Sequence, residues 1–134
     1  TSKARYLPEA AVLGGRMENI DLGHLFLQFD GRINRAKAWL GYIVVWVIGA
    51  VVGQIFGFTS AIYGLVSLLL LWPFLAVAIK RWHDRDKSGW WMLIILVPIV
   101  GVIWVLVELG FLPGTAGPNQ YGPDPLAPAA PEVA

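Results

Sequence analysis

The 134-residue sequence has no cysteine and few charged residues. Without cysteine, the chain has no disulfide bond, thiolate metal ligand or cysteine nucleophile. Charged residues make up 14% of the chain and hydrophobic residues 57%, whereas a soluble domain carries about 25% charged residues. The N-terminal segment also lacks the apolar run of a cleaved signal peptide. We therefore expect a protein that is dissolved mainly in lipid and is inserted through its own spans.

The longest uncharged stretch covers residues 38–79 and contains no Asp, Glu, Lys or Arg. One transmembrane helix needs about 20 apolar residues. The stretch therefore predicts two spans, at about residues 39–56 and 61–79, with a turn of small and polar residues near 57–60 between them.

A third apolar run covers residues 90–112 and carries one charge, Glu108, near its end. The run is long enough to cross the bilayer, and we expect it to be a third span that places Glu108 near the outer boundary. Pro98 and Gly101 leave a re-entrant hairpin as the alternative.

The segments outside the three-span region 30–112 have a different composition. Residues 1–16 are expected to be flexible. Residues 17–29 predict a short helix, either amphipathic and lying in the membrane interface or packed on the rest of the protein. Residues 113–134 contain six prolines and no Lys or Arg, which predicts an extended tail. The predicted fold is an all-α integral membrane protein with three transmembrane helices, an N-terminal interfacial helix and a Pro-rich C-terminal tail.

The positive charges are distributed unevenly. All ten Lys and Arg residues lie before the first span or in the loop 80–89. Cytoplasmic loops are enriched in Lys and Arg, so the N-terminus and this loop are predicted on the cytoplasmic side. Three spans would place the C-terminus on the opposite face, whereas a re-entrant third run would return the tail to the cytoplasm.

Three sets of residues at or near the membrane are candidate interaction sites. Glycines spaced by four on the first span allow close helix packing, either within this chain or with another subunit. Tryptophans at the inner boundary are expected to anchor the protein there. Charged residues at this boundary are expected to bind anionic lipid headgroups or to pair with one another. The glycines are Gly49, Gly53 and Gly57; the tryptophans are Trp39, Trp82, Trp90 and Trp91; the charged residues are Arg32, Arg35, Lys80, Arg81, His83, Asp84, Arg85 and Lys87.

The sequence offers little for chemistry. His83 and Asp84, with His24, are candidates for a metal site or for acid–base catalysis. A closed zinc site usually needs four ligands, however, and the chain has two histidines. No phosphate-binding or dinucleotide-binding motif is present. We expect no catalytic, cofactor-binding or metal site and no nucleic-acid partner. Gln54 is the deep polar candidate for transport, which three spans would support only in an oligomer.

Four segments match a known family. Residues 29–35 with Trp39 resemble an F-x-G-R-x-x-R…W segment, residues 81–91 an R-x-H-D…S-G-W-W loop, and Pro98 with Gly101 a break in the third apolar run. The tail resembles the closing signature G-T-x-G-x-N-x-Y-G-P-D-P at Gly114, Thr115, Gly117, Asn119, Tyr121, Gly122, Pro123, Asp124 and Pro125.

These motifs, in this order, are similar to the bacterial family called domain of unknown function 805. The chain departs from the family pattern at Lys37-Ala38 and at Gln120. The resemblance implies a protein of the bacterial inner membrane, and it implies no reaction. With three spans and the charge distribution given above, we expect a multi-pass protein with a periplasmic C-terminus. We expect a non-catalytic accessory, assembly or scaffold subunit, with membrane lipid and other membrane subunits as partners through the glycine face, the basic loop or the tail. The alternatives are an oligomeric channel or transporter component and a lipid-acting enzyme.

Overall fold

The structure is a computed structural model that describes residues 21–127. The predicted flexible segment 1–16 and the first part of the predicted helix 17–29 lie outside these residues. All regular elements within 21–127 are helical, and strand pairing is limited to one bridge between Asn119 and Gly122. The elements are α2 (Leu22–Leu27), α3 (Arg35–Phe56), α4 (Ala61–Asp84), η1 (Gly89–Leu96), α5 (Val100–Leu106) and η2 (Val107–Phe111).

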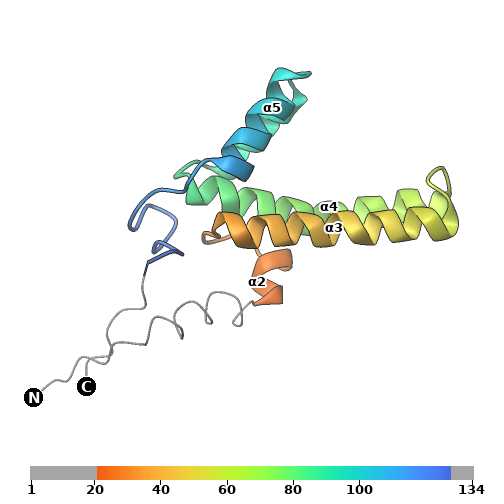
Figure 1. Cartoon of the computed structure of the whole chain (residues 1–134), viewed down its shortest axis with the longest axis horizontal. Coiled ribbons are helices and arrows are strands. Elements are labelled where there is room, and N and C mark those ends of the chain that lie inside the picture. The colour runs from red at the N-terminus through yellow and green to blue at the C-terminus, as the bar shows by residue number, and fades with distance from the viewer. Residues whose placement is uncertain (1–20, 128–134) are drawn as a thin grey trace, which may run out of the picture.

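Helices α3 and α4 form a long antiparallel hairpin (Figure 1). Asn34 caps α3 by accepting from the backbone N–H of Lys37 at 2.8 Å, and Ser60 caps α4 in the same way. Gly57 ends α3 with φ 90°, a conformation that residues with a Cβ avoid. With 22 and 24 residues, the helices are about 33 and 36 Å long, enough to cross a hydrocarbon core of about 30 Å. The two predicted spans and their turn are therefore found, with α3 starting earlier and α4 ending later than expected.

The third apolar run does not form one long helix. It consists of η1, a 3₁₀ helix of eight residues, then a break at Pro98 and Ile99, then α5, which continues into the π-helical turn η2. Its two ends meet, because Lys87 Nζ lies 2.6 Å from Glu108 Oε1. The predicted third span is therefore not found as one helix. The run turns back on itself, as in the alternative, and we call it the re-entrant hairpin.

Gly101 explains the close approach of the two arms of this hairpin. A Cβ at Gly101 would lie 1.8 Å from the backbone oxygen of Ile94, so only glycine fits there. The arms reach on the order of 16–18 Å, from 8 residues in η1 and 12 residues in α5 with η2. This is about half of the hydrocarbon core.

The tail also lies elsewhere than predicted. Thr115 N–H donates to the backbone oxygen of Asp84 at 2.7 Å, and Arg32 donates to the Gly117 oxygen at 2.8 Å. The segment after η2 thus packs on the end of the hairpin where α3 begins and α4 ends. The prediction that the tail and the loop 80–89 lie on opposite faces is wrong, because the run between them turns back.

Helix α2 packs against α4. Leu25 is buried, Phe29 makes an edge contact with Trp72 at 4.7 Å between ring centroids, and Trp72 Nε1 donates to the Leu27 oxygen at 3.1 Å. The segment therefore packs on the rest of the protein, and Leu22 and Leu27 remain exposed on it.

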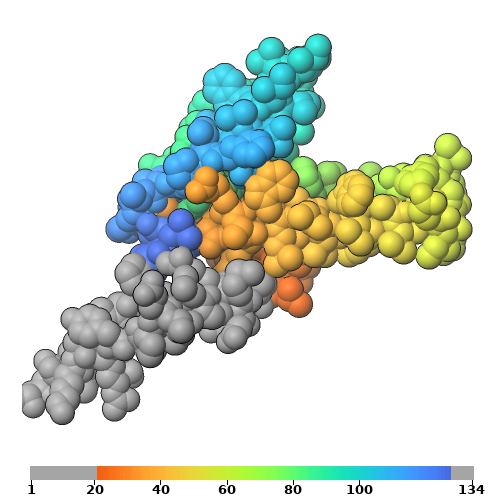
Figure 2. Space-filling model, in the orientation of Figure 1, coloured from red at the N-terminus to blue at the C-terminus, as the bar shows by residue number. Residues whose placement is uncertain are grey.

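Burial is concentrated at one end of the molecule. The buried apolar residues cluster where α2, η1 and η2 meet the basic ends of α3 and α4. The rest of the α3–α4 hairpin projects beyond them as a bare arm (Figure 2), with Trp46 72% and Leu68 71% exposed. Exposed apolar surface of this extent is expected for helices whose solvent is lipid.

Candidate functional site: a buried charge cluster at one end of the hairpin

Arg32 is the centre of a buried polar cluster at the basic end. It lies on the turn before α3, and its side chain is 1% exposed. Its Nε and one terminal nitrogen contact Asp84 Oδ1 at 3.1 and 3.0 Å. The terminal nitrogens also donate to the backbone oxygens of Thr115, Gly117 and Gly122. These contacts use all five guanidinium donors and fix the tail to the hairpin.

Lys80 is fully buried on α4 and fixes α2. Its ammonium donates to the backbone oxygens of Leu25 and Gln28, each at 2.8 Å, and to that of His24. The last carbonyls of a helix have no partner within the helix and carry partial negative charge. Lys80 therefore satisfies its own three donors and the C-terminal end of α2 together.

Side-chain donors also hold the end of the re-entrant hairpin. Four consecutive carbonyls, at residues 109–112, each accept a hydrogen bond from a side chain of α3 or α4. Irregular backbone at membrane depth is tolerated only when its polar groups are satisfied within the protein. The donors are Arg81 Nε to Leu109 at 3.0 Å, Trp39 Nε1 to Gly110 at 2.9 Å, Arg35 to Phe111 at 2.7 Å, and a terminal nitrogen of Arg81 to Leu112.

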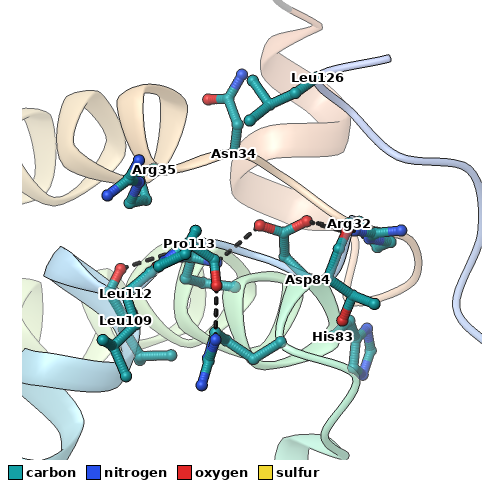
Figure 3. Close-up of polar contacts among 12 residues, drawn as sticks. Arg32, Asn34, Arg35, His83, Asp84, Leu109, Leu112, Pro113 and Leu126 are labelled. Atoms are coloured by element: carbon teal, nitrogen blue, oxygen red, sulfur yellow. Dashed lines mark hydrogen bonds and ion pairs between the residues drawn. The ribbon is translucent and has the colours of Figure 1, made fainter. Parts of the chain in front are cut away.

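Asp84 connects the two buried guanidinium groups. Its second oxygen contacts Arg81 at 2.7 Å, and Asp84 and Arg81 have 3% and 0% exposed side chains. Figure 3 shows Asp84 between the turn that carries Arg32 and the segment around Pro113. The predicted pairing of Asp84 with Arg32 is present. One carboxylate facing two guanidinium groups leaves a net positive charge, which the surrounding carbonyl oxygens offset.

His83 takes part in the fold rather than facing an open cleft. Its Nδ1 lies 3.0 Å from the Gly31 oxygen, so this nitrogen carries the proton. The ring stacks on Tyr121 with 3.9 Å between centroids and 5° between planes, and Asn119 donates to the His83 backbone oxygen at 2.9 Å. The imidazole is thus clamped between the turn before α3 and the tail.

Glu108 binds two cations of the loop after α4. Arg85 lies 2.8 Å and Lys87 2.6 Å from its carboxylate oxygens. Burial opposes ionisation, but the hydrogen bonds from Lys87 and Arg85 outweigh it and hold the pKa of Glu108 below its usual value. The expectation that Glu108 lies near the outer boundary, away from the basic loop, is wrong, because the hairpin returns it to that loop.

Lys80, Arg81 and Trp82 were predicted to contact the membrane but are buried within the chain. Lys80 and Arg81 are 0% exposed, and all three ammonium protons of Lys80 face backbone oxygens, so neither residue is available to a lipid headgroup. Trp82 is also 0% exposed and packs with Met92 and Leu109, so it is not an interface anchor.

The other three predicted anchors keep part of their surface exposed. Trp90 is 79%, Trp91 43% and Trp39 37% exposed. Lys87 lies over the Trp91 ring at 4.9 Å, a cation–π distance.

The predicted glycine face divides into three different roles. Gly57 is the turn at the end of α3, and a Cβ at Gly53 would lie 2.2 Å from the Phe58 ring of the same turn. A Cβ at Gly49 would meet Leu70 at an ordinary 3.8 Å. Gly41 makes the closer approach between the spans, since a Cβ there would lie 2.8 Å from Val77. Gly41 is in the same four-residue register, but Val45 interrupts the run of glycines, so the sequence pattern did not identify it.

The tail motif forms its own turns before it meets the cluster. Asp124 accepts from the backbone N–H groups of Gly117 and Leu126, each at 2.9 Å, and Asn119 accepts from that of Tyr121 at 2.8 Å. A Cβ at Gly114 would lie 2.0 Å from Asp84. The motif therefore positions backbone oxygens around Arg32. This role cannot be predicted from the pattern of side chains in the sequence.

The described part of the chain contains no group of three His, Asp or Glu residues placed to hold a metal ion. Apolar cavities flank the spans instead. One, of about 540 Å³, lies between the far halves of α3 and α4, and another, of about 210 Å³, lies between the spans and the re-entrant hairpin.

Comparisons with known proteins agree with the four motifs. A model of the family described as "Protein of unknown function (DUF805)" matches residues 26–123. The chain is 35% identical to the inner membrane protein YhaI of Escherichia coli (strain K12) over 108 residues, which cover 75% of this chain and 87% of YhaI. It is 32% identical to the inner membrane protein YhaH of the same strain over 111 residues (75% and 88%), and 31% identical to the uncharacterized protein YiiR over 126 residues (72% and 84%). No solved structure matches the chain. The chain therefore belongs to the DUF805 family and is a small protein of the bacterial inner membrane.

Proposed function

We propose that the protein is a non-catalytic accessory or scaffold subunit, which presents its two-span hairpin to another protein of the inner membrane. One observation carries the proposal: the polar groups of the basic end bind one another, whereas the spans are left uncovered. Only 11% of the α3 span and 17% of the α4 span is buried within the chain.

The basic end supports a structural role. An acid–base or nucleophilic site needs a titratable group that faces a substrate-accessible cleft. Here Arg32 has all its donors engaged, His83 is stacked between Tyr121 and its backbone partners, and Asp84 is enclosed by two arginines. Together with the contacts of Lys80 and Arg81, these contacts hold α2, the end of the re-entrant hairpin and the tail against the basic ends of α3 and α4. We call this end of the molecule the cap, and we assign its polar contacts a structural role.

The groove between the far halves of α3 and α4 is the surface that we assign to the partner. It has a volume of about 540 Å³ and is lined on α3 by Gly49, Ala50 and Gln54 and on α4 by Ser67 and Leu70, among others. Small residues let a further helix approach closely, and side-chain hydrogen bonds between spans contribute about 0.6–2 kcal/mol each. Exposed Gln54 offers such a bond to a partner helix, which lipid tails cannot supply.

The charge distribution supports one orientation for this subunit. The loop after α4, the start of α3 and the tail lie at the same end of the hairpin. Because this end carries the Lys and Arg residues of the described segment 21–127, we propose that it faces the cytoplasm. The described end of the tail would then be cytoplasmic, and within residues 21–127 the turn near Thr59 would be the part on the periplasmic side.

Site-specific photocrosslinking in native membranes tests the docking surface. A crosslinker at Ala50 lies in the groove, whereas one at Val51, the next residue, points about 100° away and is exposed on another face. We expect a discrete adduct from Ala50, none from Val51, and loss of the Ala50 adduct in Gly49→Leu, whose side chain fills the groove.

Three outcomes would contradict the accessory role. Equal adducts at Ala50 and Val51, or lipid adducts alone at Ala50, would show that no protein occupies the groove. An adduct to a second copy, together with ion flux in liposomes that depends on Gln54, would favour the alternative of an oligomeric channel.

A further inference from the structure

A second groove lies beside the basic end, between the spans and the re-entrant hairpin. It has a volume of about 210 Å³, and its lining is almost entirely apolar. The residues that matter here are Trp39 and Tyr42 of α3, Phe74 of α4, and Val102, Val105 and Leu109 of the hairpin. Figure 2 shows the hairpin rising away from the α3–α4 arm, so that the two diverge from the cap.

The length of the groove suits one leaflet of a membrane. It begins beside Gly110, at the hairpin end that Arg35 and Trp39 hold. Arg35 and Tyr42 are seven residues apart on one face of α3, or about 10 Å along the axis. Half of the hydrocarbon core is about 15 Å thick. The groove thus follows the direction and much of the depth of a phospholipid acyl chain anchored at the basic end.

Arg35 stands at the start of this groove with most of its donors unused. It is exposed, and among residues 21–127 its recorded hydrogen bond is the one from a terminal nitrogen to the Phe111 oxygen. A guanidinium has five donors in a planar fork that matches the oxygens of a phosphate. This separates Arg35 from the buried cations Arg32, Lys80 and Arg81, whose donors face protein oxygens.

We propose that this groove is a binding site for an anionic phospholipid. One acyl chain lies between α3 and the re-entrant hairpin, along Trp39, Tyr42 and Val105, and the phosphate binds Arg35. The apolar lining selects hydrocarbon, and the cation at its mouth selects the anionic head group. The proposal is independent of the accessory role, which concerns the far halves of the spans.

Native mass spectrometry of the full chain with equimolar phosphatidylglycerol and phosphatidylcholine tests the head-group site. We expect wild type to retain phosphatidylglycerol several-fold better than phosphatidylcholine. Arg35→Gln should lose about fivefold of that retention, which corresponds to about 1 kcal/mol for one basic residue beside anionic lipid. Arg35→Lys should restore part of it. Lys37→Gln is the matched control, because it removes the same charge about 200° around the same helix and should change nothing.

A second pair of variants tests the chain site. Val102→Trp fills the groove and should reduce the retention of both lipids, whereas Ile103→Trp, which lines a different surface of α5, should not. Equal retention of the two lipids by wild type, or equal effects of Arg35→Gln and Lys37→Gln, would overturn the head-group assignment. Unchanged retention in Val102→Trp would overturn the groove. If that variant fails to fold, the smaller Val102→Phe replaces it, and the Arg35 comparison stands without either.

Discussion

Replacing Asp84 by asparagine removes the carboxylate that two buried guanidinium groups share. In the native cluster its oxygens lie 3.0 Å from Arg32 and 2.7 Å from Arg81, and all three side chains are at most 3% exposed. The substitution changes neither shape nor volume appreciably, so its effect reports the charge. It leaves two cations facing an amide.

The expected magnitude follows from this enclosure. Removing one partner of a buried ion pair costs about 3–5 kcal/mol, because the remaining charge is left uncompensated in a site of low dielectric constant. The amide oxygen of asparagine still accepts one hydrogen bond, which places Asp84→Asn near 3 kcal/mol. The matched control is Asp86→Asn, two residues further on, where the side chain is exposed and φ is 60°. Asparagine tolerates this backbone conformation, so we expect a loss below about 0.5 kcal/mol.

Unfolding in mixed micelles, titrated with a denaturing detergent, measures this difference. The stacked pair Trp82 and Trp91 reports the packing of the cap by fluorescence. Hydrogen exchange of the Thr115 amide, which donates to the Asp84 backbone oxygen, reports tail release. If the two variants unfold within about 0.5 kcal/mol of each other, or if Thr115 exchanges equally slowly in both, then the cluster does not hold the tail and our reading of it is wrong.

Three further predictions test the hairpin, its ion pair and the topology. Gly101→Ala, whose Cβ would meet the Ile94 carbonyl oxygen at 1.8 Å, should destabilise the protein by more than about 2 kcal/mol in the same titration, whereas Gly64→Ala, which meets nothing within 4 Å, should not destabilise it. The fold lowers the pKa of Glu108, so its ion pairs stabilise the protein above its unfolded pKa, near 4.5, and this stabilisation is lost as the pH falls through the lower folded pKa. Glu108→Gln should therefore flatten that part of a profile of unfolding free energy against pH. An unchanged slope would contradict the ion pairs. In the cysteine-free chain, Ala116→Cys and Thr59→Cys should be labelled by an impermeant thiol reagent from opposite faces of the membrane, whereas a third span would place them on the same face.

The sequence was sufficient for the two spans and insufficient for the third apolar run. The uncharged stretch 38–79 predicts α3 and α4, because its length allows two membrane-crossing helices and a short turn between them. Residues 90–112 satisfy the same criterion of length and hydropathy, and Pro98 with Gly101 marked a break without saying which outcome prevails. What separates the two outcomes is the contact of Gly101 with the Ile94 backbone and the ion pairs of Glu108 with the loop, and neither is visible in hydropathy. The error in the tail followed from this one.

The candidate site was predictable where side chains pair with side chains. The need to neutralise a charge beside lipid led to the pairing of Asp84 with an arginine before α3. The contacts of Lys80 with α2 and of Arg81 with η2 were missed, because the acceptors there are backbone oxygens, and every residue carries such an oxygen. Trp82 was misplaced for a related reason: its position near the boundary is typical of an anchor, but it lies on the side of α4 that η1 and η2 cover.

The clamp around Arg32 has a consequence for how diversity within the family should be interpreted. Its tail partners are main-chain oxygens, which survive substitution of the residues that carry them so long as the path of the chain is kept. The tail motif that identifies a member of the family therefore reports how the tail is held and not what the protein does. Differences in function between members should therefore be sought on the outer surfaces of α3 and α4, which lie outside the motifs. Substitutions there can change the binding partner without weakening the cap.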